Sequence, residues 1–102
     1  MIRLSVMYPA SSSPFDWDYY LGSHHQLCHT LLDPLGMVKM EIDRGVAGFP
    51  PGAPPPFRAI AHLFFPTMET FYTALGTVGP QLMADQMNYC DGKCSLQISE
   101  VV

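Results

Sequence analysis

Four short segments of the chain alternate apolar and polar residues with a period of two, which is the pattern that predicts a β-strand. They cover residues 2–8, 37–44, 57–65 and 95–102. Pro9 ends the first segment, because proline has no backbone N–H to donate to a neighbouring strand. The third segment, FRAIAHLFF, is apolar at nearly every position, so we expect both of its faces to be buried.

Two other segments carry apolar residues at steps of three and four, the spacing of an amphipathic helix. The first predicted helix starts after a cap at Ser13 or Asp16, with acidic side chains in its first turn. The apolar face of this helix carries Trp17, Tyr20, Leu21, His24, Leu27, Cys28 and Leu31. The second starts after Thr67, is interrupted by residues 76–80, and resumes as a short helical piece over residues 81–87.

Residues 45–56 join the second and third predicted strands and contain five of the ten prolines and three of the eight glycines. Such a segment cannot form a hydrogen-bonded ladder, so we expect an exposed loop that acts as a mobile lid or rim. The element order is then strand, helix, strand, strand, helix, strand. It predicts one α+β domain over residues 1–102, with a ferredoxin-like βαββαβ order and helices on one face of a four-stranded antiparallel sheet.

Composition bears on the other face of that sheet. Apolar residues make up 48% of the 102 residues and charged residues only 14%, which leaves little charge to solvate a monomer. The third strand is apolar on both sides, so the uncovered face also favours burial. We therefore expect a homodimer in which two sheets pack face to face and close into an α/β barrel.

Charge and cysteine content exclude several classes of protein. The net charge is −4 and the five Lys and Arg residues are scattered, so we expect no nucleic-acid partner. No apolar run is long enough to span a bilayer, and the N-terminal residues lack a secretory signal. With an odd number of cysteines, the chain is expected to be cytoplasmic, although Cys90 and Cys94 flank a turn and leave a thiol pair as an alternative.

Several strings of the sequence resemble the EthD family of the dimeric α/β-barrel superfamily over nearly the whole chain. They are IRLSVMYP, FDWDYYLGSHH, the proline loop with FRAIAHLFF, and MADQMNYCDGKCSLQISEVV. Where the family reads HHxPL, this chain has no proline after His25, so we expect the helix to continue smoothly. The resemblance implies an accessory role in ether degradation, or cofactor-independent lyase, cyclase or isomerase chemistry between sheet and helices as in wider relatives.

The histidines are the main candidates for chemistry, because imidazole exchanges protons near neutral pH. On the predicted helix His24 lies mid-face, His25 at its edge and His29 on the far side, whereas His62 lies mid-strand. His62 is either a hydrogen-bonded core residue or an acid/base group. We predict that His25 and His62 line the family's cavity, close to the phenols of Tyr20 and Tyr89. The catalytic candidates are His25, His62 and Tyr20, and the ligand-binding candidates are His24, Tyr89, Trp17, Tyr8 and Arg58.

A metal site formed by His25, His29 and His62 is the competing interpretation, but His29 diverges from the cavity side, so no metal is expected. Asp85 and Asn88 either orient an imidazole or lie at the surface. The sequence has no phosphate loop, nucleotide fingerprint or nucleophile elbow, so no cofactor is expected. Two classes of function stay open: a small enzyme for an aromatic or polyketide-like molecule, and a non-catalytic binding or accessory protein.

Overall fold

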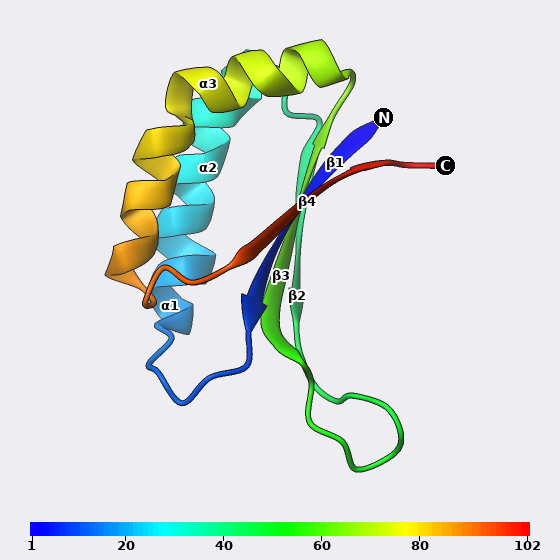
Figure 1. Cartoon of the computed structure of the whole chain (residues 1–102). Coiled ribbons are helices and arrows are strands. Elements are labelled where there is room, and N and C mark those ends of the chain that lie inside the picture. The colour runs from blue at the N-terminus through cyan, green and yellow to red at the C-terminus, as the bar shows by residue number, and fades with distance from the viewer.

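The computed structural model describes residues 1–102 and contains one four-stranded antiparallel sheet (Figure 1). The strands lie in the order β2, β3, β1, β4, with bounds Lys39–Arg44, Phe57–Phe65, Ile2–Pro9 and Ser95–Glu100. The helical elements are α1 (Trp17–Tyr19), the π-helical turn η1 (Tyr20–His24), α2 (His25–Leu32), the 3-10 turn η2 (Asp33–Leu35), α3 (Met68–Asp85) and the 3-10 turn η3 (Gln86–Asn88). The predicted α+β fold with ferredoxin-like order is confirmed.

The helices cover one face of the sheet and leave the other open (Figure 1). Side chains alternate between the faces, so Leu4, Val6, Ala61 and Leu63 pack under the helices and are buried. In the register of β1 with β3, Ser5 is the partner of His62 and both lie on the open face. The expectation that β3 is buried on both sides holds for Phe64, over which Lys39 Nζ lies 4.5 Å from the ring centroid, but His62 is only half-buried.

The first helical region begins as expected, since Asp16 Oδ1 accepts a hydrogen bond from the backbone N–H of Tyr19 at 3.0 Å. It does not continue smoothly, because η1 inserts a wider π-turn just before His25. Across the wider turn, residues four positions apart share one face of the helical region. The buried residues on this face are Tyr20, His24, Cys28 and Leu32. The predicted place of Leu21 on the apolar face is therefore wrong, since Leu21 is 45% exposed.

Helix α3 is continuous, so the interruption predicted at residues 76–80 is wrong. Thr67 caps its start as predicted by accepting a hydrogen bond from the backbone N–H of Thr70 at 3.1 Å. Pro80 lies inside the helix, where it removes one backbone hydrogen bond, and α3 curves over the sheet (Figure 1). Phe71 and Leu82 are buried on the two sides of this defect, and their packing holds both halves of the helix to the sheet.

Residues 45–56 form a loop that projects beyond the ends of β2 and β3, away from the helices (Figure 1). Two backbone hydrogen bonds join residues within the loop, from Gly48 N to Ala53 O at 2.8 Å and from Ala53 N to Pro50 O at 3.0 Å. The prediction of an exposed loop is confirmed, whereas its mobility stays a prediction. None of the helices combines the length and apolarity that crossing a membrane requires.

Candidate functional site

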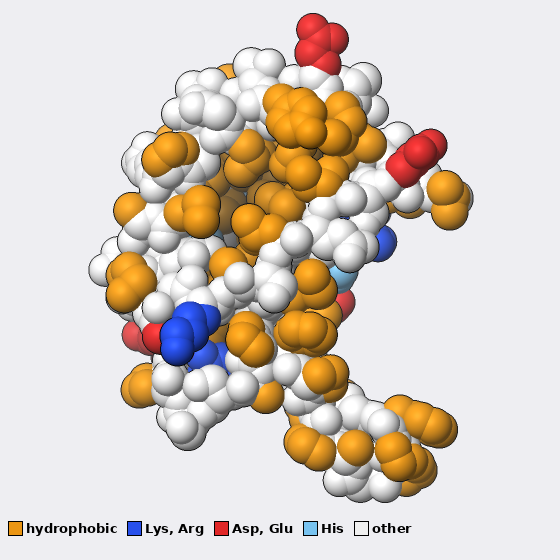
Figure 2. All heavy atoms as spheres, in the orientation of Figure 1, with side chains coloured by type: hydrophobic (Ala, Val, Ile, Leu, Met, Phe, Trp, Pro, Cys, Tyr) orange, Lys and Arg blue, Asp and Glu red, His pale blue; other side chains and the backbone are white.

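A cavity lies between the helices and the sheet and opens beside β4. Figure 2 shows hydrophobic side chains gathered in a hollow between α3 and β4. The cavity and its opening together hold about 570 Å³, and 12 of the 15 residues that line it are hydrophobic, among them Leu63, Leu82 and Leu96. No Lys or Arg is among the lining residues. A mostly apolar lining without a cationic side chain suits a small uncharged molecule.

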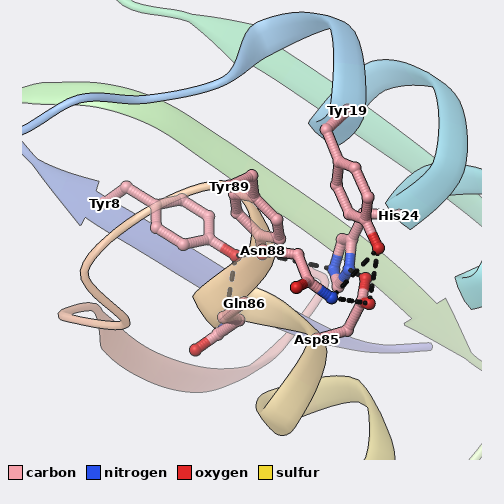
Figure 3. Close-up of polar contacts among 7 residues, drawn as sticks. All are labelled: Tyr8, Tyr19, His24, Asp85, Gln86, Asn88 and Tyr89. Carbon is pink, nitrogen blue, oxygen red and sulfur yellow. Dashed lines mark hydrogen bonds and ion pairs between the residues drawn. The ribbon is translucent and has the colours of Figure 1, made fainter.

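His24 is the one titratable nitrogen group in the cavity wall, and it is only 6% exposed. Its Nδ1 lies 2.8 Å from Oδ2 of Asp85, which is the last residue of α3 (Figure 3). The Asp85 carboxylate also accepts hydrogen bonds from Tyr19 Oη at 2.7 Å and from Asn88 Nδ2 at 2.9 Å. Burial opposes ionisation of Asp85, but the hydrogen bonds from His24, Tyr19 and Asn88 outweigh it, so its pKa lies below the ordinary value.

Two tyrosine hydroxyls continue this network on the other side of the imidazole (Figure 3). Tyr89 Oη lies 3.3 Å from His24 Nε2 and 2.6 Å from Tyr8 Oη, and Gln86 Nε2 donates to Tyr8 Oη at 3.3 Å. Tyr8, Gln86 and His24 line the cavity, whereas Tyr89 lies behind them. Burial raises the pKa values of Tyr8 and Tyr89 far above the ordinary range, so both phenols are neutral.

Tyr20 and Cys28 complete the helix side of the wall. The Tyr20 ring stacks on that of His24 with centroids 5.9 Å apart, and its buried hydroxyl has no hydrogen-bond partner. Burial raises the pKa of Tyr20 far above its ordinary value, and raises that of the Cys28 thiol to about 12. Both groups are therefore neutral near pH 7.

His25 does not line the cavity. It is half-buried on the outer side of the helix, and its ring lies 4.8 Å from that of His29. Desolvation, followed by the charges of His29 and His24, lowers its pKa. The predicted place of His25 at the cavity is thus wrong, because the helix turns its neighbour His24 toward the sheet instead.

His62 also lies outside the cavity, on the opposite face of the sheet. Its Nδ1 is 3.2 Å from Ser5 Oγ, and its Nε2 is 2.9 Å from Asp43 Oδ2. The neighbouring Ala61 and Leu63 point under the helices, so strand alternation turns His62 the other way. The prediction that His25 and His62 share one cavity with Tyr20 and Tyr89 is wrong.

Trp17 and Arg58 do not line the cavity either. The guanidinium of Arg44 lies 4.1 Å from the centroid of the Trp17 ring, and Arg58 donates to the backbone oxygen of Ser13. Nowhere do three His, Cys, Asp or Glu side chains gather closely enough to hold a metal ion, so the set of His25, His29 and His62 is not assembled. Cys90 and Cys94 are free thiols.

Sequence reasoning identified part of the network around His24. Of the two alternatives given for Asp85, the structure supports the first, because its carboxylate is hydrogen-bonded to the imidazole of His24. Asn88 donates a hydrogen bond to the carboxylate of Asp85. Gln86 was missed, because a glutamine between helix and loop carries no periodic signal. The useful signal was the string MADQMNY, which contains Asp85, Gln86, Asn88 and Tyr89.

Comparison with known proteins places the chain among its relatives. The EthD domain matches residues 9–93, which is most of the chain. The protein belongs to the EthD family. A search of curated proteins found no match to this EthD protein.

Three solved structures are similar to this EthD protein. The crystal structure of an EthD-like protein from Ralstonia eutropha JMP134 shares 35% identity with a TM-score of 0.90, over 99% of this chain and 91% of the other. An ethyl tert-butyl ether D (EthD) family protein from Bacillus halodurans C-125 has 21% identity and a TM-score of 0.78, over 100% and 99% of the two chains. A protein from Arabidopsis thaliana has 10% identity and a TM-score of 0.68, over 99% and 94%; these last two show the fold alone.

Proposed function

We propose that this EthD protein binds a small, uncharged, aromatic or polyketide-like molecule in the cavity between sheet and helices, and that His24 exchanges a proton with it. The observation that carries the proposal is a histidine in a mostly apolar wall, bonded to a partly buried carboxylate. The apolar lining favours a hydrophobic ligand. The lack of a lining Lys or Arg disfavours a carboxylate or phosphate, whose charge would be desolvated without a partner.

The role of His24 follows from its partners. An ionised Asp85 accepts the hydrogen on Nδ1, which leaves Nε2 as the basic nitrogen of a neutral imidazole. Asp85 also stabilises the imidazolium that forms when Nε2 gains a proton. Removal of a proton beside a ligand carbonyl would give an enolate, the first step shared by lyase, cyclase and isomerase reactions. The chemistry uses only side chains of the chain and requires no cofactor.

A non-catalytic binding protein, for example an accessory protein of an ether or aromatic degradation pathway, is the second candidate. One observation favours it: both ring nitrogens of His24 already have hydrogen-bond partners within the chain. A catalytic His24 would have to exchange its bond to Tyr89 for one to the ligand, whereas a binding protein would not.

Deuterium exchange distinguishes the two candidates. The probe is acetophenone, an aromatic ketone whose methyl hydrogens exchange slowly with D₂O, followed by proton NMR. Under the catalytic reading the wild type accelerates exchange and His24→Asn lowers the acceleration by about 10²-fold. The control is His29→Asn, because His29 lies at the surface and contacts Asp33 instead. Binding without accelerated exchange would favour the binding protein, and absence of both would contradict the proposal.

We also propose that two chains pair through their open sheet faces. The support is the apolar side chains Met7 and Ile60, which lie half-buried on that face of the sheet with no helix over them. Partly exposed apolar side chains on the uncovered face of so small a domain favour association. The pairing surface lies on the opposite side of the sheet from the cavity, so each chain would keep its own ligand site.

A further inference from the structure

The hydrogen-bond network beside the cavity has a direction, and Asp85 sets it. Its carboxylate accepts three hydrogen bonds and holds a lowered pKa, through the same balance of burial and donors described above, so it is ionised near pH 7. The Nδ1 of His24 must then carry a hydrogen. In a neutral imidazole the other nitrogen, Nε2, has none and can only accept.

The directions of the next bonds follow one from another. Tyr89 donates its only hydrogen to His24 Nε2, so the 2.6 Å contact between the two phenols must be a donation from Tyr8 to Tyr89. Gln86 donates from Nε2 to Tyr8. With His24 neutral, the single hydrogen of Tyr8 is therefore used inside the network and is not available to the cavity.

A proton on His24 Nε2 reverses this direction. The imidazolium donates to Tyr89, Tyr89 turns its hydrogen to Tyr8, and the oxygen of Tyr8 accepts from both Tyr89 and Gln86. The hydrogen of Tyr8 is then released from the network. Since Tyr8 lines the cavity, a ligand oxygen there is the available acceptor.

We infer that Tyr8 is a ligand-recognition residue whose donor is switched on by protonation of His24, so that the cavity takes up one proton when it binds a neutral carbonyl compound. The inference rests on the ligand site of the proposed function and deepens it by naming the ligand class. The complex with protonated His24 holds the ligand without removing its proton, so the proposed proton removal would proceed only from the fraction of the complex in which His24 is neutral. The favoured ligand has an uncharged carbonyl oxygen that accepts a hydrogen bond. The proton comes from solvent, and no covalent bond of the ligand changes.

The other titratable groups around His24 keep their protonation states near pH 7, so a proton taken up on binding is assigned to His24. The titratable side chains that face it or adjoin it are Asp85, Tyr19, Tyr20, Tyr89, Cys28 and His25. Buried phenols and the buried thiol have raised pKa values and stay protonated. The hydrogen bond to Asp85 raises the pKa of Tyr19, and desolvation lowers that of His25. Near pH 7 Tyr19 therefore keeps its hydrogen and His25 stays neutral.

Calorimetry with two matched probes tests the inference. Acetophenone carries a carbonyl oxygen, and α-methylstyrene has the same shape with a CH₂ group in place of that oxygen. Titrations in two buffers of different ionisation enthalpy count the protons taken up on binding. At a pH where NMR of the ligand-free protein shows neutral His24, acetophenone should bind with uptake of about one proton, and its affinity should fall about tenfold per pH unit. The hydrocarbon should bind with no uptake.

Two tyrosine variants sharpen the test. Tyr8→Phe should abolish the proton uptake with acetophenone while binding of α-methylstyrene persists. The control Tyr72→Phe removes the hydroxyl of a tyrosine that is 60% exposed on α3 and should leave the uptake unchanged. Binding of acetophenone by the wild type without proton uptake, or uptake that survives Tyr8→Phe, would overturn the inference.

A failure of the proposed function has a different signature. If neither probe binds, the cavity is not the ligand site, and the direction of the network is then decided by the nitrogen-15 NMR shifts of His24 in the free protein. The inference requires the neutral ring to carry its hydrogen on Nδ1. In acid the ring should gain a second hydrogen, on Nε2. A neutral ring protonated on Nε2 would overturn the inference by itself.

Discussion

Nδ1 of His24 lies 2.8 Å from Oδ2 of Asp85, although the two residues are 61 positions apart in the sequence. The contact joins the π-turn η1 to the C-terminal end of α3. It places a histidine and a carboxylate at the edge of an apolar cavity, where a hydrogen bond to a charged carboxylate is stronger than in water. The same contact therefore holds the helix layer together and defines the candidate site.

Replacement of Asp85 by Asn should destabilise the protein. The variant loses the charge that three donors share, and we expect the free energy of unfolding at pH 7 to fall by about 1–3 kcal/mol. Urea denaturation followed by circular dichroism measures the loss. The control Asp18→Asn removes an exposed carboxylate of α1 and should change stability much less.

The pH dependence of that loss has a defined sign. The folded-state pKa of Asp85 lies below its ordinary value, so its contribution is complete above the unfolded-state value and disappears as pH falls through the folded-state value. The difference between wild type and Asp85→Asn should therefore shrink as pH falls below about 4. An equal difference at pH 7 and pH 3 would contradict the role assigned to the carboxylate.

Gly36 should tolerate substitution less well than another glycine of positive φ. It ends the first helical region with φ of 102°, and an added Cβ would lie 2.5 Å from Thr70 Cγ2. Gly52 has φ of 91° but open space around it. Gly52→Ala should cost only the backbone strain of about 1–2 kcal/mol, and Gly36→Ala that strain plus the clash. Thermal unfolding of both variants provides the comparison, and equal losses would argue against the close packing of η2 on α3.

Charged substitutions should separate the two faces of β3. Ile60→Glu on the open face should give a folded monomer, because it would place a charge in the proposed dimer interface. Leu63→Glu should unfold the chain, since Leu63 is 5% exposed under the helices. Sedimentation and circular dichroism measure both effects, with Thr73→Glu on the exposed side of α3 as the control. A wild-type monomer at micromolar concentration would exclude the dimer.

Much of the fold was predictable from local signals. Strand β3 was predicted with the correct bounds, because Pro56 and Pro66 flank it and its interior is continuously apolar. Asp16, one of the two caps considered for the first helix, is the one observed, and the predicted cap at Thr67 was correct as well. The continuity of α3 through Pro80 was not predictable from those signals, because it depends on burial of Phe71 and Leu82 against a sheet formed by distant residues.

The candidate site was less predictable, for two physical reasons. In β3 both faces are apolar, so alternation alone did not reveal which face meets the helices, and His62 was assigned to the wrong one. The helical wheel correctly put His24 mid-face and His25 at the edge, but it did not distinguish a mid-face residue that lines a cavity from one enclosed by packing, so His25 was ranked above His24. His24, Tyr8 and Tyr20 were nonetheless placed near a ligand, and all three line the cavity.

Ligand binding by two glycine variants of α3 tests the central claim, that the cavity is the ligand site. Gly79 is buried in the cavity wall, and a Cβ there would meet only the side chain of Leu75, at 3.6 Å. Gly76 is exposed on the same helix with no atom near its added Cβ. Gly79→Leu should fill the cavity and weaken acetophenone binding at least about tenfold, equivalent to about 1.4 kcal/mol, while Gly76→Leu binds like the wild type. Undiminished binding by Gly79→Leu, measured by calorimetry on the folded variant, would contradict the account.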